Sequence, residues 1–126
     1  MGLLAAKLLS VNSQSDYEMS TTAIPVEAKE EALRIIAQFN EEVLAGSDCC
    51  YVPRFKGKYL YLDRDDSGIV GPVCRLDYNR RKHLWEFAIY KYSADRYDPE
   101  DWFFPGSDLV DGTIEGALKA GMQAYE

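Results

Sequence analysis

Tyrosines and basic residues alternate along the middle of the chain, and this pattern suggests a binding surface. Alternate residues of a β-strand lie on one face of a sheet. In the segments 50–64 and 73–92 the alternation groups four tyrosines with two arginines on one predicted face. Such rings can stack nucleic-acid bases while cations hold phosphates, or they can pack against protein. The candidate binding residues are Arg54, Tyr59, Tyr61, Arg75, Tyr90 and Tyr92.

A second basic group lies in or beside the two predicted hairpin turns. Residues 49–92 carry nine Lys or Arg against five Asp or Glu, whereas residues 1–48 and 93–126 are both acidic. Single-stranded nucleic acid is therefore one alternative partner, although the formal net charge of −7 repels a polyanion. We favour packing of the tyrosines, under residues 93–110 or at a dimer interface. The basic turn residues are Lys56, Lys58, Arg80, Arg81 and Lys82.

Carboxylates between residues 95 and 111 are the candidates for acid–base or magnesium chemistry. They allow a small hydrolase or a metal-dependent enzyme as a further alternative. Two of them are also expected to cap helical turns, and an acidic run of this kind is more often a solvated surface. The run consists of Asp95, Asp98, Glu100, Asp101, Asp108 and Asp111.

Catalytic and metal-binding motifs are scarce. The chain has three cysteines, Cys49, Cys50 and Cys74, no C-x-x-C pair and a single histidine, His83. We therefore predict no zinc site, no metal and no cofactor. No G-x-S-x-G, P-loop, dinucleotide-binding glycine pattern or H-E-x-x-H occurs, so no residue is assigned a catalytic role. The cysteines are expected to be free thiols in a reducing cytoplasm.

Two helices are predicted at the ends of the folded part. Apolar residues recur at spacings of three and four over 26–45, which indicates an amphipathic helix that ends before Gly46. A last helix is expected over about 112–125, capped by Asp111 or Thr113.

Two hairpins are predicted between these helices. Lys56-Gly57 has the length of a two-residue turn, and this register would pair Arg54 with Tyr59. The second hairpin joins the strands 73–78 and 84–92. Residues 93–110 are expected to be irregular, with one helical turn from Asp98 and with Trp102–Phe104 folded back over the sheet.

The predicted fold is a single α+β domain over residues 22–126. It has two layers: a four-stranded antiparallel sheet of two hairpins, with the N-terminal and C-terminal helices on one face, in the order α-β-β-β-β-α. Residues 1–21 are expected to be a disordered tail. No apolar run approaches the roughly 18 residues of a membrane span, so no membrane partner is predicted.

The leading functional hypothesis is a small cytoplasmic, non-enzymatic binding module that acts as a homodimer. Its contacts are expected on the tyrosine-bearing face, on a sheet edge or on the glycine-bearing last helix. The alternatives are single-stranded nucleic-acid binding through the basic sheet and enzyme chemistry on the 95–111 carboxylates.

Overall fold

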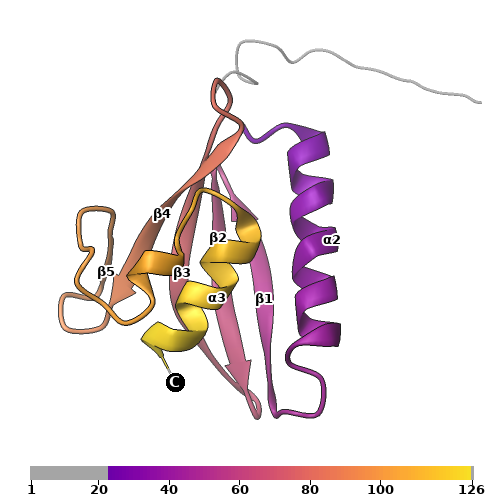
Figure 1. Ribbon diagram of the computed structural model, residues 1–126, viewed down its shortest axis with the longest axis vertical. Coiled ribbons are helices and arrows are strands. Elements are labelled where there is room, and N and C mark those ends of the chain that lie inside the picture. Colours follow the sequence, from indigo (N-terminus) through magenta and orange to yellow (C-terminus); the bar gives the residue numbers. More distant parts are fainter. Residues whose placement is uncertain (1–22, 126) are drawn as a thin grey trace, which may run out of the picture.

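The computed structural model describes residues 23–125 and has an α+β fold with one antiparallel sheet (Figure 1). Helix α2 (Val26–Glu42) precedes the sheet, and helix α3 (Ile114–Ala124) follows it. The predicted class and the helix at each end are confirmed, but the sheet has five strands instead of four. The tail predicted over 1–21 lies outside the described residues. The strands are β1 (Cys49–Lys56), β2 (Tyr59–Asp66), β3 (Ile69–Asn79), β4 (Leu84–Lys91) and β5 (Arg96–Asp98).

The sheet is a continuous meander in the order β1-β2-β3-β4-β5, not two separate hairpins. Strand β3 begins at Ile69, four residues before the predicted start, and a two-residue turn joins it to β2. Ser67 and Gly68 in this turn both have positive φ, at 56° and 94°, as a type I′ hairpin turn requires. The Asp65 carboxylate accepts the Gly68 N–H at 2.7 Å and stabilises the turn.

The predicted register of β1 and β2 is wrong by two residues. Their turn is Gly57-Lys58, with Gly57 at φ 61° in the first position, where a two-residue turn of type II′ places glycine. Arg54 therefore pairs with Tyr61. Because side chains alternate with a period of two, a shift of two residues leaves each of them on its predicted face.

Strand β5 replaces part of the segment predicted to be irregular. It pairs with the end of β4, Tyr97 opposite Tyr90. The helical turn predicted from Asp98 is absent: the Asp98 carboxylate accepts the Glu100 N–H at 3.0 Å, as a cap would, but only a turn at residues 99–100 follows. A short 3₁₀ helix, η1 (Ser107–Leu109), comes before α3.

Both helices cover the same face of the sheet, and the core lies between them. Ile36 of α2, Leu118 of α3 and Leu60 of β2 are all buried in one hydrophobic cluster. Tyr51 is also buried there, and its hydroxyl donates to the Leu118 carbonyl at 2.7 Å. Thr113 caps α3 by accepting the Gly116 N–H at 2.9 Å. Of the two caps predicted for this helix, Asp111 and Thr113, the structure therefore uses Thr113. Within residues 23–125 the other face of the sheet carries no helix.

Candidate binding surface

Six side chains form the tyrosine–arginine face on the side of the sheet that the helices leave uncovered. Five of them were predicted to share this face, and the structure places them together. Tyr97 of β5 is the sixth and was not predicted. The face consists of Arg54, Tyr59, Tyr61, Arg75, Tyr90 and Tyr97.

The tyrosine rings of this face contact one another. The centroids of Tyr59 and Tyr61 are 5.9 Å apart, and those of Tyr90 and Tyr97 are 5.1 Å apart. Tyr61 on β2 and Tyr97 on β5 also meet, at 5.3 Å, although two strands separate them. Their side chains therefore reach toward each other across β3 and β4, and the rings form a half-buried layer in which neighbouring rings are tilted by 60–68° to one another.

The two arginines stack on these rings. The Arg54 guanidinium carbon lies 4.5 Å from the Tyr61 centroid, and that of Arg75 lies 4.2 Å from the Tyr59 centroid. Arg54 is also held by both oxygens of Asp63, at 3.1 and 3.3 Å, and these hydrogen bonds raise the pKa of its guanidinium. Among the described residues Arg75 has no carboxylate within 4.0 Å. Arg75 is thus the stacked cation best placed to meet an external carboxylate or phosphate.

Tyr92, the other predicted residue of this face, lies one residue beyond the end of β4 at Lys91, and its ring meets the Tyr90 ring edge-on with the centroids 4.8 Å apart. The Tyr92 ring packs edge-on against Tyr125, which follows α3, and its hydroxyl donates to the Pro72 carbonyl at 3.1 Å. Tyr92 therefore ties the C-terminal end of the chain to β3.

Tyr97 was missed because a strand of three residues is too short to show alternation. Burial raises the pKa of its hydroxyl. The hydroxyl of its neighbour Tyr90 donates to Asp95, and this hydrogen bond raises the pKa of Tyr90 to about 12. Both tyrosines therefore stay neutral at physiological pH.

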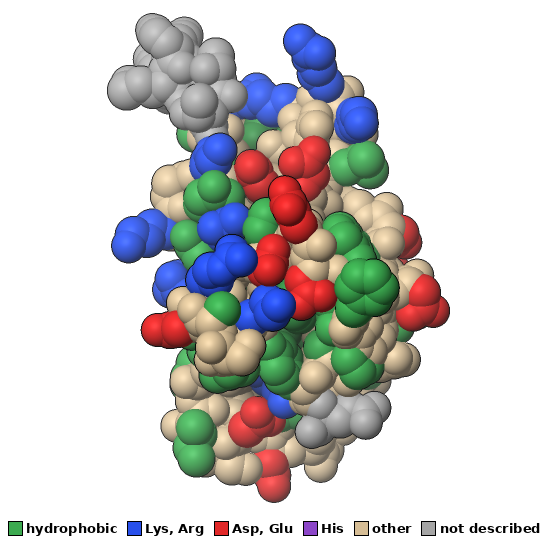
Figure 2. All heavy atoms as spheres, turned by 90° about the vertical axis from the view of Figure 1, so that its left-hand side faces the viewer, with side chains coloured by type: hydrophobic (Ala, Val, Ile, Leu, Met, Phe, Trp, Pro, Cys, Tyr) green, Lys and Arg blue, Asp and Glu red, His purple; other side chains and the backbone are tan. Residues whose placement is uncertain are grey.

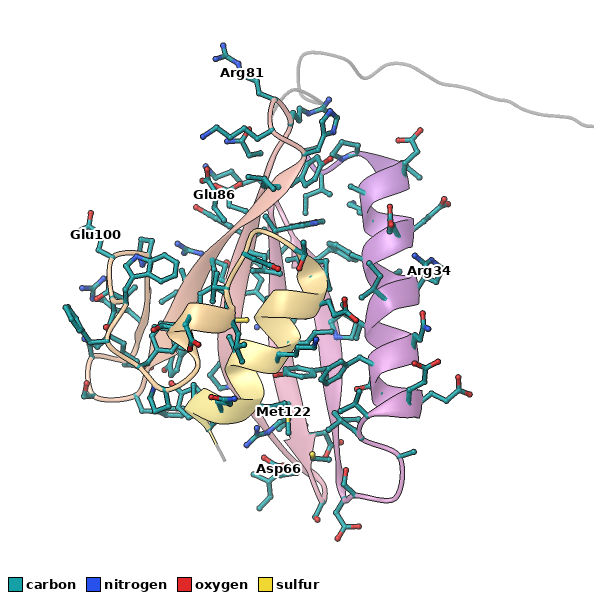
Figure 3. The ribbon with its side chains drawn as sticks, viewed as in Figure 1. Arg34, Asp66, Arg81, Glu86, Glu100 and Met122 are labelled. Carbon is teal, nitrogen blue, oxygen red and sulfur yellow. The ribbon has the colours of Figure 1, made fainter. Side chains whose placement is uncertain are left out.

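The basic turn residues lie at one end of the sheet. The antiparallel register places the β1–β2 turn beside the β3–β4 turn, because Tyr59 pairs with Asp77. The first turn brings Lys56 and Lys58, and the second brings Arg80, Arg81 and Lys82. Arg80 donates to the Ala23 carbonyl at 3.5 Å, while Arg81 points away from the body of the molecule (Figure 3).

The opposite end of the sheet is acidic. The β2–β3 turn follows Asp65 and Asp66, and Asp48 comes just before β1. Figure 3 shows Asp66 and Arg81 at opposite ends of the molecule. From the β5 side, Lys and Arg side chains gather on one half of the surface, with Asp and Glu side chains beside them (Figure 2). Charge of both signs therefore surrounds the tyrosine–arginine face.

Four carboxylates of the predicted run, those of Asp95, Asp98, Asp101 and Asp111, have structural partners. Asp101 accepts the Phe103 N–H at 2.9 Å and pairs with Lys91 at 3.1 Å, and these contacts lower its pKa. Hydrogen bonds from Thr113 lower the pKa of Asp111. A general acid needs a raised pKa, so these carboxylates do not favour hydrolase chemistry. Within residues 23–125 no group of three His, Cys, Asp or Glu side chains is placed to hold a metal ion.

The three cysteines are free thiols. Cys74 is buried, and burial raises the pKa of its thiol, which suppresses the reactive thiolate. Cys49 and Cys50 begin β1, whereas His83 lies in the β3–β4 turn at the other end of the sheet. The structure therefore brings no thiol of β1 to the histidine as a nucleophile–base pair.

Comparison with known proteins gives no family for this chain: no family model, no curated protein and no solved structure matches it. Within the described part of the chain, neither helix is long and apolar enough to cross a bilayer.

Proposed function

We propose that this chain is a non-enzymatic interaction module that acts as a homodimer, with two copies packing through the tyrosine–arginine face. One observation carries this proposal: both described helices cover one side of the sheet, and on the other side no described helix lies over the half-buried tyrosines. Faces of sheets pack on one another in many proteins, and tyrosine is enriched in interfaces.

The other two surfaces predicted to make contacts are less suitable. The glycines of α3 are used inside the fold, because a Cβ on Gly121 would lie 2.5 Å from the Tyr51 hydroxyl and one on Gly116 would lie 2.3 Å from Asp111. At the β5 edge only three residues are paired in the strand. Short edge strands disfavour pairing with another chain.

A second copy suits the charges around this face. One end of the sheet is basic, with Lys56, Arg81 and Lys82, and the other end is acidic, with Asp48 and Asp65 beside the ion pair of Asp66 and Arg64. If two copies pack with their strands antiparallel, the basic end of each lies over the acidic end of the other. This arrangement pairs opposite charges twice, and such complementarity favours one partner and one orientation.

The face is also of a suitable size. The five strands have 8, 8, 11, 8 and 3 residues, and they give a footprint of about 600 Å² at about 4.8 Å between strands and about 3.3 Å per residue. The relief of the side chains and the flanking turns add to this area. Stable interfaces bury about 800 Å² on each partner, so a contact of this kind fits a specific dimer.

Nucleic acid is less well supported as the partner. Arg54 is neutralised by Asp63, Lys58 lies 3.8 Å from Asp77, and Lys91 pairs with Asp101. A polyanion gains affinity from each unpaired cation that it contacts, and internal ion pairs reduce that gain. One measurement of mass and absorbance distinguishes a second copy of the chain from nucleic acid as the partner.

Light scattering on a sizing column, with absorbance at 260 and 280 nm, tests the proposal. We expect a protein peak without nucleic acid at twice the 14.3 kDa of one chain. A monomer at all concentrations would refute the homodimer. A monomer with excess absorbance at 260 nm would instead favour nucleic-acid binding.

A further inference from the structure

Phe103 is the most exposed large apolar side chain among the described residues, with 99% of its surface accessible. It lies in the loop between β5 and η1. Interface hot spots are side chains that fill a well-packed pocket on the partner. The question is which surface receives it.

The loop holds Phe103 in a fixed position. The Asp101 carboxylate accepts the Phe103 N–H, and Lys91 of β4 pairs with the same carboxylate. The two neighbouring rings, Trp102 and Phe104, stack on each other at 6.3 Å and on Phe87 of the core at 6.4 and 5.7 Å. Phe103 is thus presented on a supported turn, which lowers the entropy lost on binding.

A groove of about 330 Å³ lies between α2, the β3–β4 hairpin and the start of α3. Most of its lining residues are aliphatic or aromatic, with Thr113 and with Glu31, whose carboxylate pairs with Arg34 at 3.5 Å, on its walls. A cavity of about 150 Å³ already accommodates benzene. The groove is therefore large enough for a phenylalanine ring, and tyrosine and tryptophan walls favour edge-on contact with that ring. The residues that would touch it are Ala28, Ala32, Ile35, Tyr78, His83 and Trp85.

Charge complementarity connects these two features. The loop that carries Phe103 also carries Glu100, Asp101 and Asp108, and Figure 3 shows Glu100 projecting outward. The turn beside the groove carries Arg80 to Lys82. An acidic loop with an apolar tip therefore matches an apolar groove with a basic turn at its rim.

From these observations we infer that Phe103 of one copy binds in the α2–hairpin groove of another copy. The contact cannot form within one molecule, because Phe103 is fully exposed in the same structure that contains the groove. Each chain has one such loop and one such groove, so the contact can link successive copies. It is separate from the tyrosine–arginine face and does not depend on that dimer.

The first test is the dependence of mass on protein concentration. We expect the average mass of the wild-type protein to rise above that of the dimer as its concentration increases. Phe103→Ala should weaken this association about tenfold or more, as loss of a central anchor does. Ile69→Ala is the matched control, since Ile69 is also an exposed apolar residue, 78% accessible, in a different turn. Equal masses for the wild type and Phe103→Ala at every concentration would overturn the inference.

The second test uses complementation. Ala28→Trp fills the groove from α2, and Ala28→Leu serves as the smaller filling if the tryptophan variant does not fold. Alone, neither Phe103→Ala nor the groove variant should increase in mass beyond the dimer as its concentration rises. Their mixture should associate, because Phe103→Ala keeps the groove and the groove variant keeps Phe103. If the mixture shows no gain in mass, the inference fails. If the sheet-face dimer alone is wrong, both variants are monomers and the mixture still associates.

Discussion

At the scale of single residues, two side chains at the start of α3 show how polar groups set a helix end. The Asp111 carboxylate accepts the N–H and the hydroxyl of Thr113, at 3.1 and 2.6 Å. Thr113 in turn accepts the Gly116 N–H. These contacts satisfy donors that a helix N-terminus leaves unpaired, and they require an ionised Asp111 for full strength.

The stability of the fold should therefore depend on the charge of Asp111. Hydrogen bonds from Thr113 lower the folded-state pKa of Asp111 below its ordinary value of 3.8. The ionised group thus adds stability above that value, and this contribution is lost as the pH falls through the lowered pKa. We expect Asp111→Asn to be less stable than the wild type at neutral pH and the difference to shrink in acid. Urea unfolding across this range measures it, and a difference independent of pH would contradict the role of the charge.

Removing the cap itself gives a second expectation. Thr113→Ala should lower the free energy of unfolding by about 1 kcal/mol, the usual cost of losing a helix cap. Thr113→Ser keeps the hydroxyl and should retain most of that stability. Thermal or urea unfolding of the two variants measures the effect. Equal stability for both would show that the hydrogen bond to Gly116 is not what stabilises this helix end.

At the scale of elements, α3 depends on close packing against the sheet. Gly121 is buried, and a Cβ there would lie 2.5 Å from the Tyr51 hydroxyl and 2.7 Å from a Val73 methyl. Helix propensity alone predicts that alanine at this position stabilises the helix by about 1 kcal/mol. The contacts predict the opposite sign.

We expect Gly121→Ala to destabilise the protein by about 1–3 kcal/mol, as overpacking of a core does. Lys119→Ala is the control on the exposed side of the same helix. Urea unfolding of both variants decides the sign. A more stable Gly121→Ala protein would mean that α3 can move away from Tyr51 without cost.

Periodicity and strand pairing explain which helices and strands could be predicted from the sequence and which could not. The helices were predictable because a period near 3.6 persists over each of them, and the faces of β1 to β4 were predictable because alternation does not depend on register. The β1–β2 register was not, because Lys56-Gly57 and Gly57-Lys58 are both plausible two-residue turns. Strand β5 has three residues and no pattern of its own. Its existence, and with it the place of Tyr97, depends on pairing with β4.

At the scale of the whole molecule, the arrangement of charge emerges only from the meander. The sequence shows a basic segment between acidic ones, but only the continuous strand order places both basic turns at one end and Asp65 and Asp66 at the other. Together with the uncovered layer of tyrosines, this polarity is what favours a second copy as the partner. The cytoplasmic location predicted from the free thiols stays a prediction.

The most direct test of the homodimer is sedimentation equilibrium on a matched pair of variants. Tyr61→Asp places a charge in the middle of the tyrosine–arginine face, whereas Leu33→Asp places the same charge on α2, at a side chain that is 43% exposed. Tyr61→Asp also removes the ring that contacts Tyr59 and Tyr97. In a Phe103→Ala background, which excludes association through Phe103, we therefore predict that Tyr61→Asp is a monomer and that Leu33→Asp keeps the dimer mass. A dimer that survives Tyr61→Asp while Leu33→Asp breaks it would place the interface on the helices and contradict the proposal.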